Sequence, residues 1–99
     1  EPQSELAHTH SSDMVRDGYY DHEAPDGRTF LPACRPAAEN LYLADTSATS
    51  PEYTAEKTVQ AWLKSENHRE ILLSSRWTTV GVGVSLQWGG PQYVTANFC

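Results

Sequence analysis

Residues 79–88, TVGVGVSLQW, alternate apolar side chains with small or polar ones. The apolar members are Val80, Val82, Val84 and Leu86. This period of two is typical of a β-strand with two unlike faces. Gly81 and Gly83 are unusual inside a strand, and they predict that a helix or another backbone approaches closely there. The chain then turns at GGP, residues 89–91, and QYVTANF, residues 92–98, returns as the partner strand of a hairpin.

The residues before this hairpin change to helical spacing. Leu6, His10 and Met14 fall at i, i+4 and i+8, which predicts a helix over residues 4–16 that ends at Gly18. A second helix is expected to begin at residues 50–52, SPE, which supply a cap, a proline and an acid. Its apolar face would comprise Ala55, Val59, Trp62 and Leu63. Ser65 is a candidate cap for a short third helix through ENHREILL, residues 66–73.

The remaining segments are less regular. Residues 24–37 hold three prolines and indicate a loop, and residues 45–50, DTSATS, indicate a polar linker. AENLYLA, residues 38–44, is compatible with a strand or with the end of a loop. Helices followed by a hairpin predict an α+β fold with an antiparallel sheet. We expect the hairpin over residues 79–98 to pack under the helix that carries Val59, Trp62 and Leu63.

Length and charge exclude several classes of protein. Ninety-nine residues suffice for one small domain with a single core. Thirteen acidic residues against seven basic ones give a net charge of −6, which argues against a nucleic-acid partner. The sequence contains no apolar run near the roughly 20 residues that a transmembrane helix needs.

Cys34 and Cys99 are the only cysteines. An even pair with one member at residue 99 indicates a disulfide that holds the C-terminal residues in place. Two free buried thiols are the alternative. A disulfide would in turn indicate an exported protein, because thiols stay reduced in the cytosol.

The four histidines differ in their surroundings. His8 and His10 lie two residues apart on the first predicted helix and therefore point to different faces, so we interpret them as surface or packing residues. His22 and His68 each lie beside the boundary of an element. Glu39 lies within an apolar stretch, where a carboxylate needs a partner. By spacing alone, caps and simple hydrogen-bond partners remain the alternative for these three residues.

Five segments occur in the order and spacing of one known family: HSSDMVRDGYYDHEAPDG, AENLYL, AWLKSENHREILL, TTVGVGV and YVTANF. They resemble the CAP superfamily of cysteine-rich secretory, antigen 5 and pathogenesis-related proteins (SCP/TAPS), and most closely its bacterial and archaeal branch. The resemblance covers residues 6–98. It implies an α-β-α sandwich with a central antiparallel sheet and helices on both faces. The family's first helix is incomplete here, so we expect residues 1–99 to be a single domain that is truncated at its N-terminus or cut from a longer chain.

The resemblance also implies a cleft that holds two histidines and two glutamates. By motif, these positions fall on His22, Glu39 and His68, and the fourth falls on Ser65. Glu66 is one residue away, but that offset turns a helical side chain by about 100°. The cleft would suit Zn²⁺ or another divalent metal held by His22 and His68, with Glu39 as a third candidate ligand.

Two functions follow from the resemblance. The first is an extracellular or cell-surface module, without enzymatic activity, that binds a protein or a lipid-like small molecule. The second is a hydrolase that uses a metal or a His/Glu pair. The sequence shows no activated nucleophile, since Ser65 is predicted to cap a helix and both cysteines are predicted to be structural. We therefore favour the binding module and assign no catalytic residue.

Overall fold

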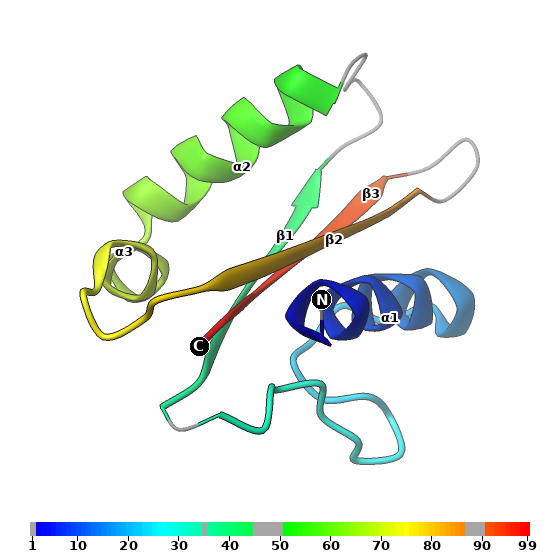
Figure 1. The fold of residues 1–99 in the computed structure, drawn as a ribbon. Coiled ribbons are helices and arrows are strands. Elements are labelled where there is room, and N and C mark those ends of the chain that lie inside the picture. The colour runs from blue at the N-terminus through cyan, green and yellow to red at the C-terminus, as the bar shows by residue number, and fades with distance from the viewer. Residues whose placement is uncertain (1, 35, 45–50, 87–90) are drawn as a thin grey trace.

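The computed structural model describes residues 2–34, 36–44, 51–86 and 91–99, which form three helices and three strands. Helices lie on both faces of one sheet, as Figure 1 shows, so the expected α+β sandwich is confirmed. The elements in chain order are α1 (Pro2–Asp17), β1 (Ala38–Ala44), α2 (Pro51–Lys64), α3 (Glu66–Leu73), β2 (Val80–Leu86) and β3 (Gln92–Phe98).

The sheet has the strand order β1-β3-β2 and is antiparallel throughout. AENLYLA, which the sequence left open between strand and loop, is the strand β1. β3 lies in the centre of the sheet, and six of its seven residues are buried. The predicted hairpin of β2 and β3 is confirmed, with Val84 opposite Val94. The linker over residues 45–50 and the turn, most of which falls in residues 87–90, lie outside the described residues.

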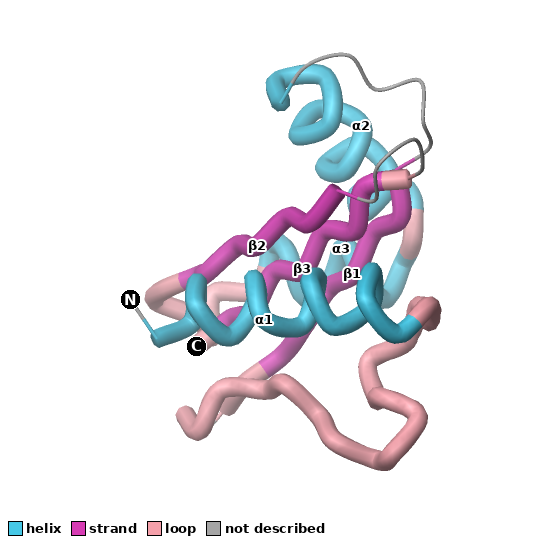
Figure 2. The backbone as a smooth tube through the Cα atoms, turned by 90° about the vertical axis from the view of Figure 1, so that its right-hand side faces the viewer, coloured by secondary structure: helices cyan, strands magenta, loops and turns pink. Residues whose placement is uncertain are grey.

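Helix α1 packs across β2 and β3, and the glycines of β2 permit that contact (Figure 2). A Cβ atom added to Gly81 would collide with the backbone of Gln3 and Ser4, and one added to Gly83 would collide with His8. The close approach predicted from the two glycines is therefore confirmed. The helix ends as predicted at Gly18, whose φ of 70° suits glycine.

Helices α2 and α3 cover the opposite face of the sheet. Trp62 anchors α2, because its indole Nε1 donates a hydrogen bond to the carbonyl of Leu41 in β1 at 2.9 Å. The same side chain packs in a core cluster with Val94, Ala96 and Phe98 of β3. The expectation that this helix packs on the hairpin holds in part: Trp62 packs against β3, but the main neighbours of α2 are β1 and α3, and α1 covers β2 and β3 on the other face.

The buried face of α2 also differs from the predicted one. Thr54, Thr58 and Trp62 are buried, whereas Ala55, Val59 and Leu63 are exposed. Placing the indole of Trp62 over β1 fixes the rotation of the helix, and the two threonines then face inward. The buried Thr58 hydroxyl donates a hydrogen bond to the carbonyl of Thr54 in the same helix at 2.7 Å.

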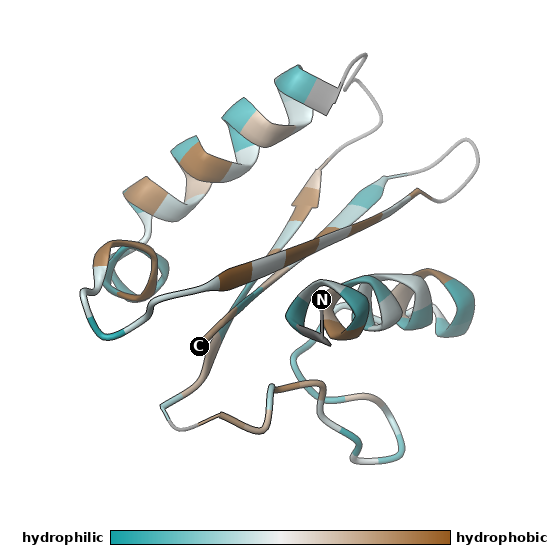
Figure 3. Cartoon of the chain, viewed as in Figure 1, coloured by the Kyte–Doolittle hydropathy of each residue, from teal (hydrophilic) through white to brown (hydrophobic). Residues whose placement is uncertain are grey.

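The apolar residues of β2 point away from α1 and remain open to solvent. Val80, Val82, Val84 and Leu86 are 44–57% exposed, while Gly81 and Gly83 are buried. Figure 3 shows the apolar bands along β2 and on α2. The inward face is the glycine face because α1 comes too close for larger side chains.

The predicted disulfide between Cys34 and Cys99 is confirmed, with Cα atoms 5.9 Å apart and a sequence separation of 65. It joins the loop before β1 to the residue after β3. In the chain-entropy model, closing such a loop contributes about 4 kcal/mol to stability. No helix among the described residues is long and apolar enough to span a membrane.

Candidate functional site

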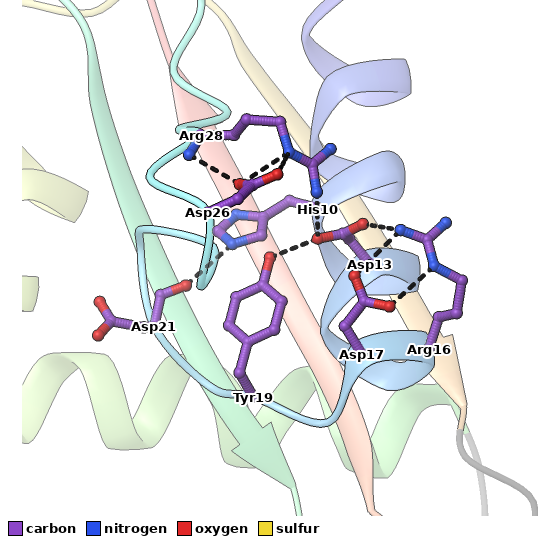
Figure 4. A network of polar contacts seen from close by, with 8 residues as sticks. All are labelled: His10, Asp13, Arg16, Asp17, Tyr19, Asp21, Asp26 and Arg28. Carbon is purple, nitrogen blue, oxygen red and sulfur yellow. Dashed lines mark hydrogen bonds and ion pairs between the residues drawn. The ribbon is translucent and has the colours of Figure 1, made fainter.

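A polar network around Asp13 fixes the loop that carries His22 onto helix α1 (Figure 4). Asp13 is buried, and its carboxylate accepts hydrogen bonds from the Tyr19 hydroxyl at 2.8 Å and from the guanidinium groups of Arg16 and Arg28. Burial and the bond to Asp13 raise the pKa of Tyr19 far above its usual value, so the phenol stays a neutral donor. The network holds both ends of the loop, since Tyr19 precedes His22 and Arg28 follows it.

Glu39 lies at the centre of the site and is bonded to two imidazoles. It projects from β1 and is buried, with Oε1 at 2.7 Å from His22 Nδ1 and Oε2 at 3.1 Å from His10 Nδ1. Burial alone would raise the pKa of Glu39, but the hydrogen bonds from the two histidines outweigh it and hold the pKa below its usual value. Glu39 is therefore a carboxylate with both oxygens engaged.

His22 lies at the solvent side of this carboxylate, and 56% of its side chain is exposed. The hydrogen bond to Glu39 raises its pKa against the opposing effect of partial burial. Its Nδ1 atom is occupied by Glu39, and among the described residues nothing is bonded to Nε2.

His68 approaches the site from helix α3. Asn40, the neighbour of Glu39 on β1, donates to the backbone carbonyl of His68 at 3.1 Å and ties α3 to the sheet. The pKa of His68 is lowered by burial and by the charge of His22. The structure thus joins His22 directly to Glu39, and it places the backbone of His68 beside Asn40, the next residue of the strand.

Ser65 occupies the fourth position in an unexpected way. It is the N-cap of α3 by backbone position, as predicted, but its side chain makes no cap hydrogen bond. The hydroxyl instead lies 2.8 Å from His68 Nδ1. The predicted N-cap position is therefore confirmed, and the hydroxyl bonds to an imidazole in place of a backbone N–H. Glu66, the other candidate for this position, is exposed to solvent.

His10 is the site residue that the sequence interpretation missed. It is fully buried and contacts Glu39, whereas His8 is exposed. The helical spacing indicates that His10 is buried, because His10 lies between Leu6 and Met14 on the stripe that faces the sheet. A histidine on an apolar stripe needs polar partners in the interior, and Glu39 is one of them.

The donor set offers few ligands for a metal ion. Among the described residues, no group of three or more His, Cys, Asp or Glu side chains is placed to hold one. Both oxygens of Glu39 already bind imidazoles, so the available donors are the Nε2 atoms of His22 and His68. The described residues therefore do not form a complete metal site by themselves.

Comparison with known proteins identifies relatives of this fold. The model of the cysteine-rich secretory protein family (CAP) matches residues 4–98. An extracellular protein containing a SCP domain from Bacillus anthracis superposes with a TM-score of 0.75 at 28% identity, over 99% of this chain and 31% of that one. An outer surface protein from Borrelia burgdorferi, at 16% identity and a TM-score of 0.72, shares the fold over 98% of this chain and 71% of its own.

Two Bacillus subtilis proteins are similar in sequence. The uncharacterized membrane protein YlbC is 30% identical over 98 residues, which are 99% of this chain and 27% of YlbC. The uncharacterized protein YkwD is 30% identical over 80 residues, 81% of this chain and 31% of YkwD. The chain therefore spans less than a third of the length of either relative.

Proposed function

This chain belongs to the cysteine-rich secretory protein (CAP) family, and we propose that it is a non-enzymatic extracellular module whose His22–His68 pair holds a divalent metal ion such as Zn²⁺. The disulfide and the extracellular or outer-surface description of both structural relatives support the location. One observation carries the metal site: each imidazole has its Nδ1 atom fixed by a neighbour and its Nε2 atom free of partners among the described residues.

Fixed Nδ1 atoms prepare the two imidazoles for ligation. Histidines that bind metals usually donate their other ring N–H to a carboxylate, a carbonyl or a similar acceptor. Glu39 supplies such an acceptor for His22 at 2.7 Å, and the hydroxyl oxygen of Ser65 supplies one for His68 at 2.8 Å. A bound ion would offer its remaining positions to oxygen ligands from a partner.

The partner itself would use the apolar surface, defined here as Val80, Val82, Val84 and Leu86 of β2. These side chains are 44–57% exposed. The four β2 residues point to the face of the sheet that α2 occupies, and α2 lies over β1 and leaves them open. An elongated strip of this kind suits an amphipathic helix of a protein partner better than a small molecule, which needs an enclosed cavity.

A hydrolase is the second candidate, and the Ser65–His68 contact favours it. The lowered pKa of His68 keeps this imidazole neutral at pH 7, as a general base must be. In that role the Ser65 hydroxyl donates to Nδ1, and the neutral imidazole carries its proton on Nε2. Metal binding requires the reverse, with Nδ1–H donating to Ser65 and Nε2 unprotonated. The two functions therefore require opposite tautomers of His68.

Zinc titration by calorimetry tests the metal site. We expect His22→Ala and His68→Ala each to weaken zinc binding by about tenfold or more, and His8→Ala, the exposed control on α1, to leave it unchanged. Glu39→Gln should have an intermediate effect. Affinity should fall as the pH drops through the imidazole range near about 6.5, because only neutral imidazole binds the ion. Equal affinity in the wild type and the His22→Ala/His68→Ala double variant would refute the site.

The tautomer of His68 separates the two functions. Long-range ¹⁵N–¹H spectra of metal-free protein at pH 8 report which ring nitrogen carries the proton. A proton on Nδ1 supports the metal site. A proton on Nε2, together with fluorophosphonate labelling that Ser65→Ala abolishes, would support the hydrolase and overturn the first proposal.

A further inference from the structure

Strand β2 forms one edge of the sheet, because the strand order is β1-β3-β2 (Figure 2). Thr79 and Cys99, just beyond the paired strands, exchange two backbone hydrogen bonds of 3.0 and 3.1 Å. Bonded and non-bonded pairs alternate along an antiparallel ladder, so the odd-numbered residues of β2 turn their backbone groups to β3. The N–H and C=O groups of Val80, Val82 and Val84 therefore point out of the sheet.

This outer edge is open among the described residues. No backbone or side-chain group there is bonded to the outward N–H and C=O groups of the three valines, whose side chains are 44–52% exposed. The opposite edge is different: the carbonyl of Leu41 in β1 accepts the Trp62 indole N–H at 2.9 Å, and Leu41 is buried. A row of unpaired backbone groups on an edge strand is a template for another strand.

The edge specifies the backbone of its occupant. Its N–H and C=O groups recur at every second residue, about 7 Å apart, which is the repeat of another extended chain. Directly opposite residues of an antiparallel pair have their side chains on the same face. The occupant's residues opposite the three valines would therefore supply the backbone bonds and place their side chains on the valine face.

A second copy of this chain does not fit at the edge. The backbone of α1 lies directly over β2, since Cβ atoms added to Gly81 and Gly83 would collide with it. Antiparallel pairing of two β2 strands would set them about 5 Å apart, with both α1 helices on the same face at a similar separation. Packed helices need about 8–10 Å between their axes. The net charge of −6 also opposes self-association.

The same geometry specifies the occupant's side chains. A helix is about 10 Å wide, so α1 extends over the position of an added strand, and side chains on that face must be small. On the other face, apolar side chains would extend the apolar surface of β2. The negative charge of this chain favours basic flanking residues.

We propose that the outer edge of β2 pairs with an extended segment of a protein partner, which adds a strand to the sheet and alternates small with apolar residues. This inference rests on the proposed binding of a protein partner and adds a backbone contact to it. The partner's strand bonds to the edge, and its amphipathic helix covers the apolar surface. The metal site is not involved, so all tests use metal-free protein.

Amide hydrogen exchange of the wild-type protein tests the pairing. The probe is a short peptide that alternates valine with serine between terminal lysines. It should slow exchange at Val82 and Val84 by about tenfold or more, and leave Gly81 and Gly83 unchanged because their amides already bond to β3. The same peptide N-methylated at each valine keeps its side chains, lacks those donors and should have no effect. Unchanged exchange at Val82 and Val84 with the first peptide would overturn the proposal.

Two variants separate the backbone contact from the side-chain contact. Val82→Pro removes an outward N–H that β3 does not use, which an edge strand tolerates. Val82→Ser keeps this N–H and removes apolar surface. Val82→Pro should weaken binding of the valine–serine peptide about tenfold more than Val82→Ser. Circular dichroism checks that both variants fold, and the exchange measurement is decisive without them.

Two other outcomes would overturn the edge pairing. A loss of peptide binding in Val82→Ser as large as in Val82→Pro would show binding through the valine side chains alone, and would leave the proposed apolar contact intact. A dimer of the wild type in sedimentation, absent in Val82→Pro, would assign the edge to a second copy of the chain.

Discussion

The two faces of the sheet are closed by different means. On one face, α1 lies against the backbone of β2, where Gly81 and Gly83 have no side chains. Polar contacts cross this interface, since the buried Ser11 hydroxyl lies 2.8 Å from Thr95 Oγ1 and 3.1 Å from the carbonyl oxygen of Gly83. On the other face, Trp62 fills the space over β1 and β3, and the valines of β2 stay exposed. The tighter interface is therefore the one with the smaller side chains.

The largest effect is expected at Trp62. Trp62→Ala should lower the free energy of unfolding by about 3–5 kcal/mol, because it removes a buried aromatic ring and leaves a cavity. Urea denaturation followed by circular dichroism measures it. Val59→Ala, on the exposed side of the same helix, should change stability by no more than about 0.5 kcal/mol. Comparable losses in both variants would contradict the observed rotation of α2.

Adding one carbon atom to a glycine of β2 that faces α1 should destabilise the fold. Gly83→Ala should lower the free energy of unfolding by about 1–3 kcal/mol, because the new Cβ atom meets backbone atoms of α1 that cannot turn aside. Thermal unfolding of this variant and of Ser85→Ala gives the comparison, since Ser85 on the same strand already carries a Cβ atom. If Gly83→Ala is as stable as the wild type, α1 does not approach β2 as closely as described.

The two site histidines should respond to pH in opposite directions. His22 has a raised pKa in the folded state, so its contribution to stability is full below the ordinary imidazole pKa of about 6.5 and is lost as the pH rises through the folded value. His68 has a lowered pKa, so its contribution is full above about 6.5 and is lost as the pH falls.

Urea midpoints of two variants across pH 5–8 show these contributions. Relative to the wild type, His22→Gln should be most destabilised at the acidic end of the range. His68→Gln should be least destabilised there, because the variant lacks the imidazole whose lowered pKa destabilises the wild-type fold at acidic pH. Parallel pH profiles for the two variants would contradict the assigned pKa directions.

The smallest effect is expected on the apolar surface. Val82→Ser should change the free energy of unfolding by about 0.5 kcal/mol or less, because the side chain is 52% exposed in the wild type. Denaturation at two protein concentrations measures it. A loss of about 2 kcal/mol or more that grows with concentration would show that another copy of the chain covers this surface in solution.

Much of the fold could be predicted from the sequence, because its signals are local. The helix end at Gly18, the hairpin and the close approach at Gly81 and Gly83 each depend on a few adjacent residues. Which face is buried depends on the whole assembly. The alternation over residues 80–86 marks two faces of a strand, but only the path of α1 decides that the glycine face points inward. In α2, the indole of Trp62 sets the rotation in the same way.

The site shows a similar limit. Motif positions indicated His22, Glu39 and His68; in the structure His22 is bonded to Glu39, and the backbone of His68 is bonded to the adjacent residue Asn40. His10 was missed because its partners, Glu39 and the carbonyl of Asp21, come from segments that nothing in the sequence places beside α1. Ser65 was interpreted as a cap because caps are the usual role of serine before a helix. Its hydroxyl bonds to His68, which lies three residues later in the first turn of α3, at a spacing that brings side chains together.

The strand order constrains when the sheet can assemble. β1 pairs with β3 and not with β2, although β2 comes earlier in the chain. While the polypeptide is being synthesised, β1 must therefore remain without its neighbour until residues 92–98 have emerged. Cys34 must likewise wait for Cys99, 65 residues later. Such long-range pairing slows folding, so most of this domain's chain is exposed to chaperones and proteases before its structure closes.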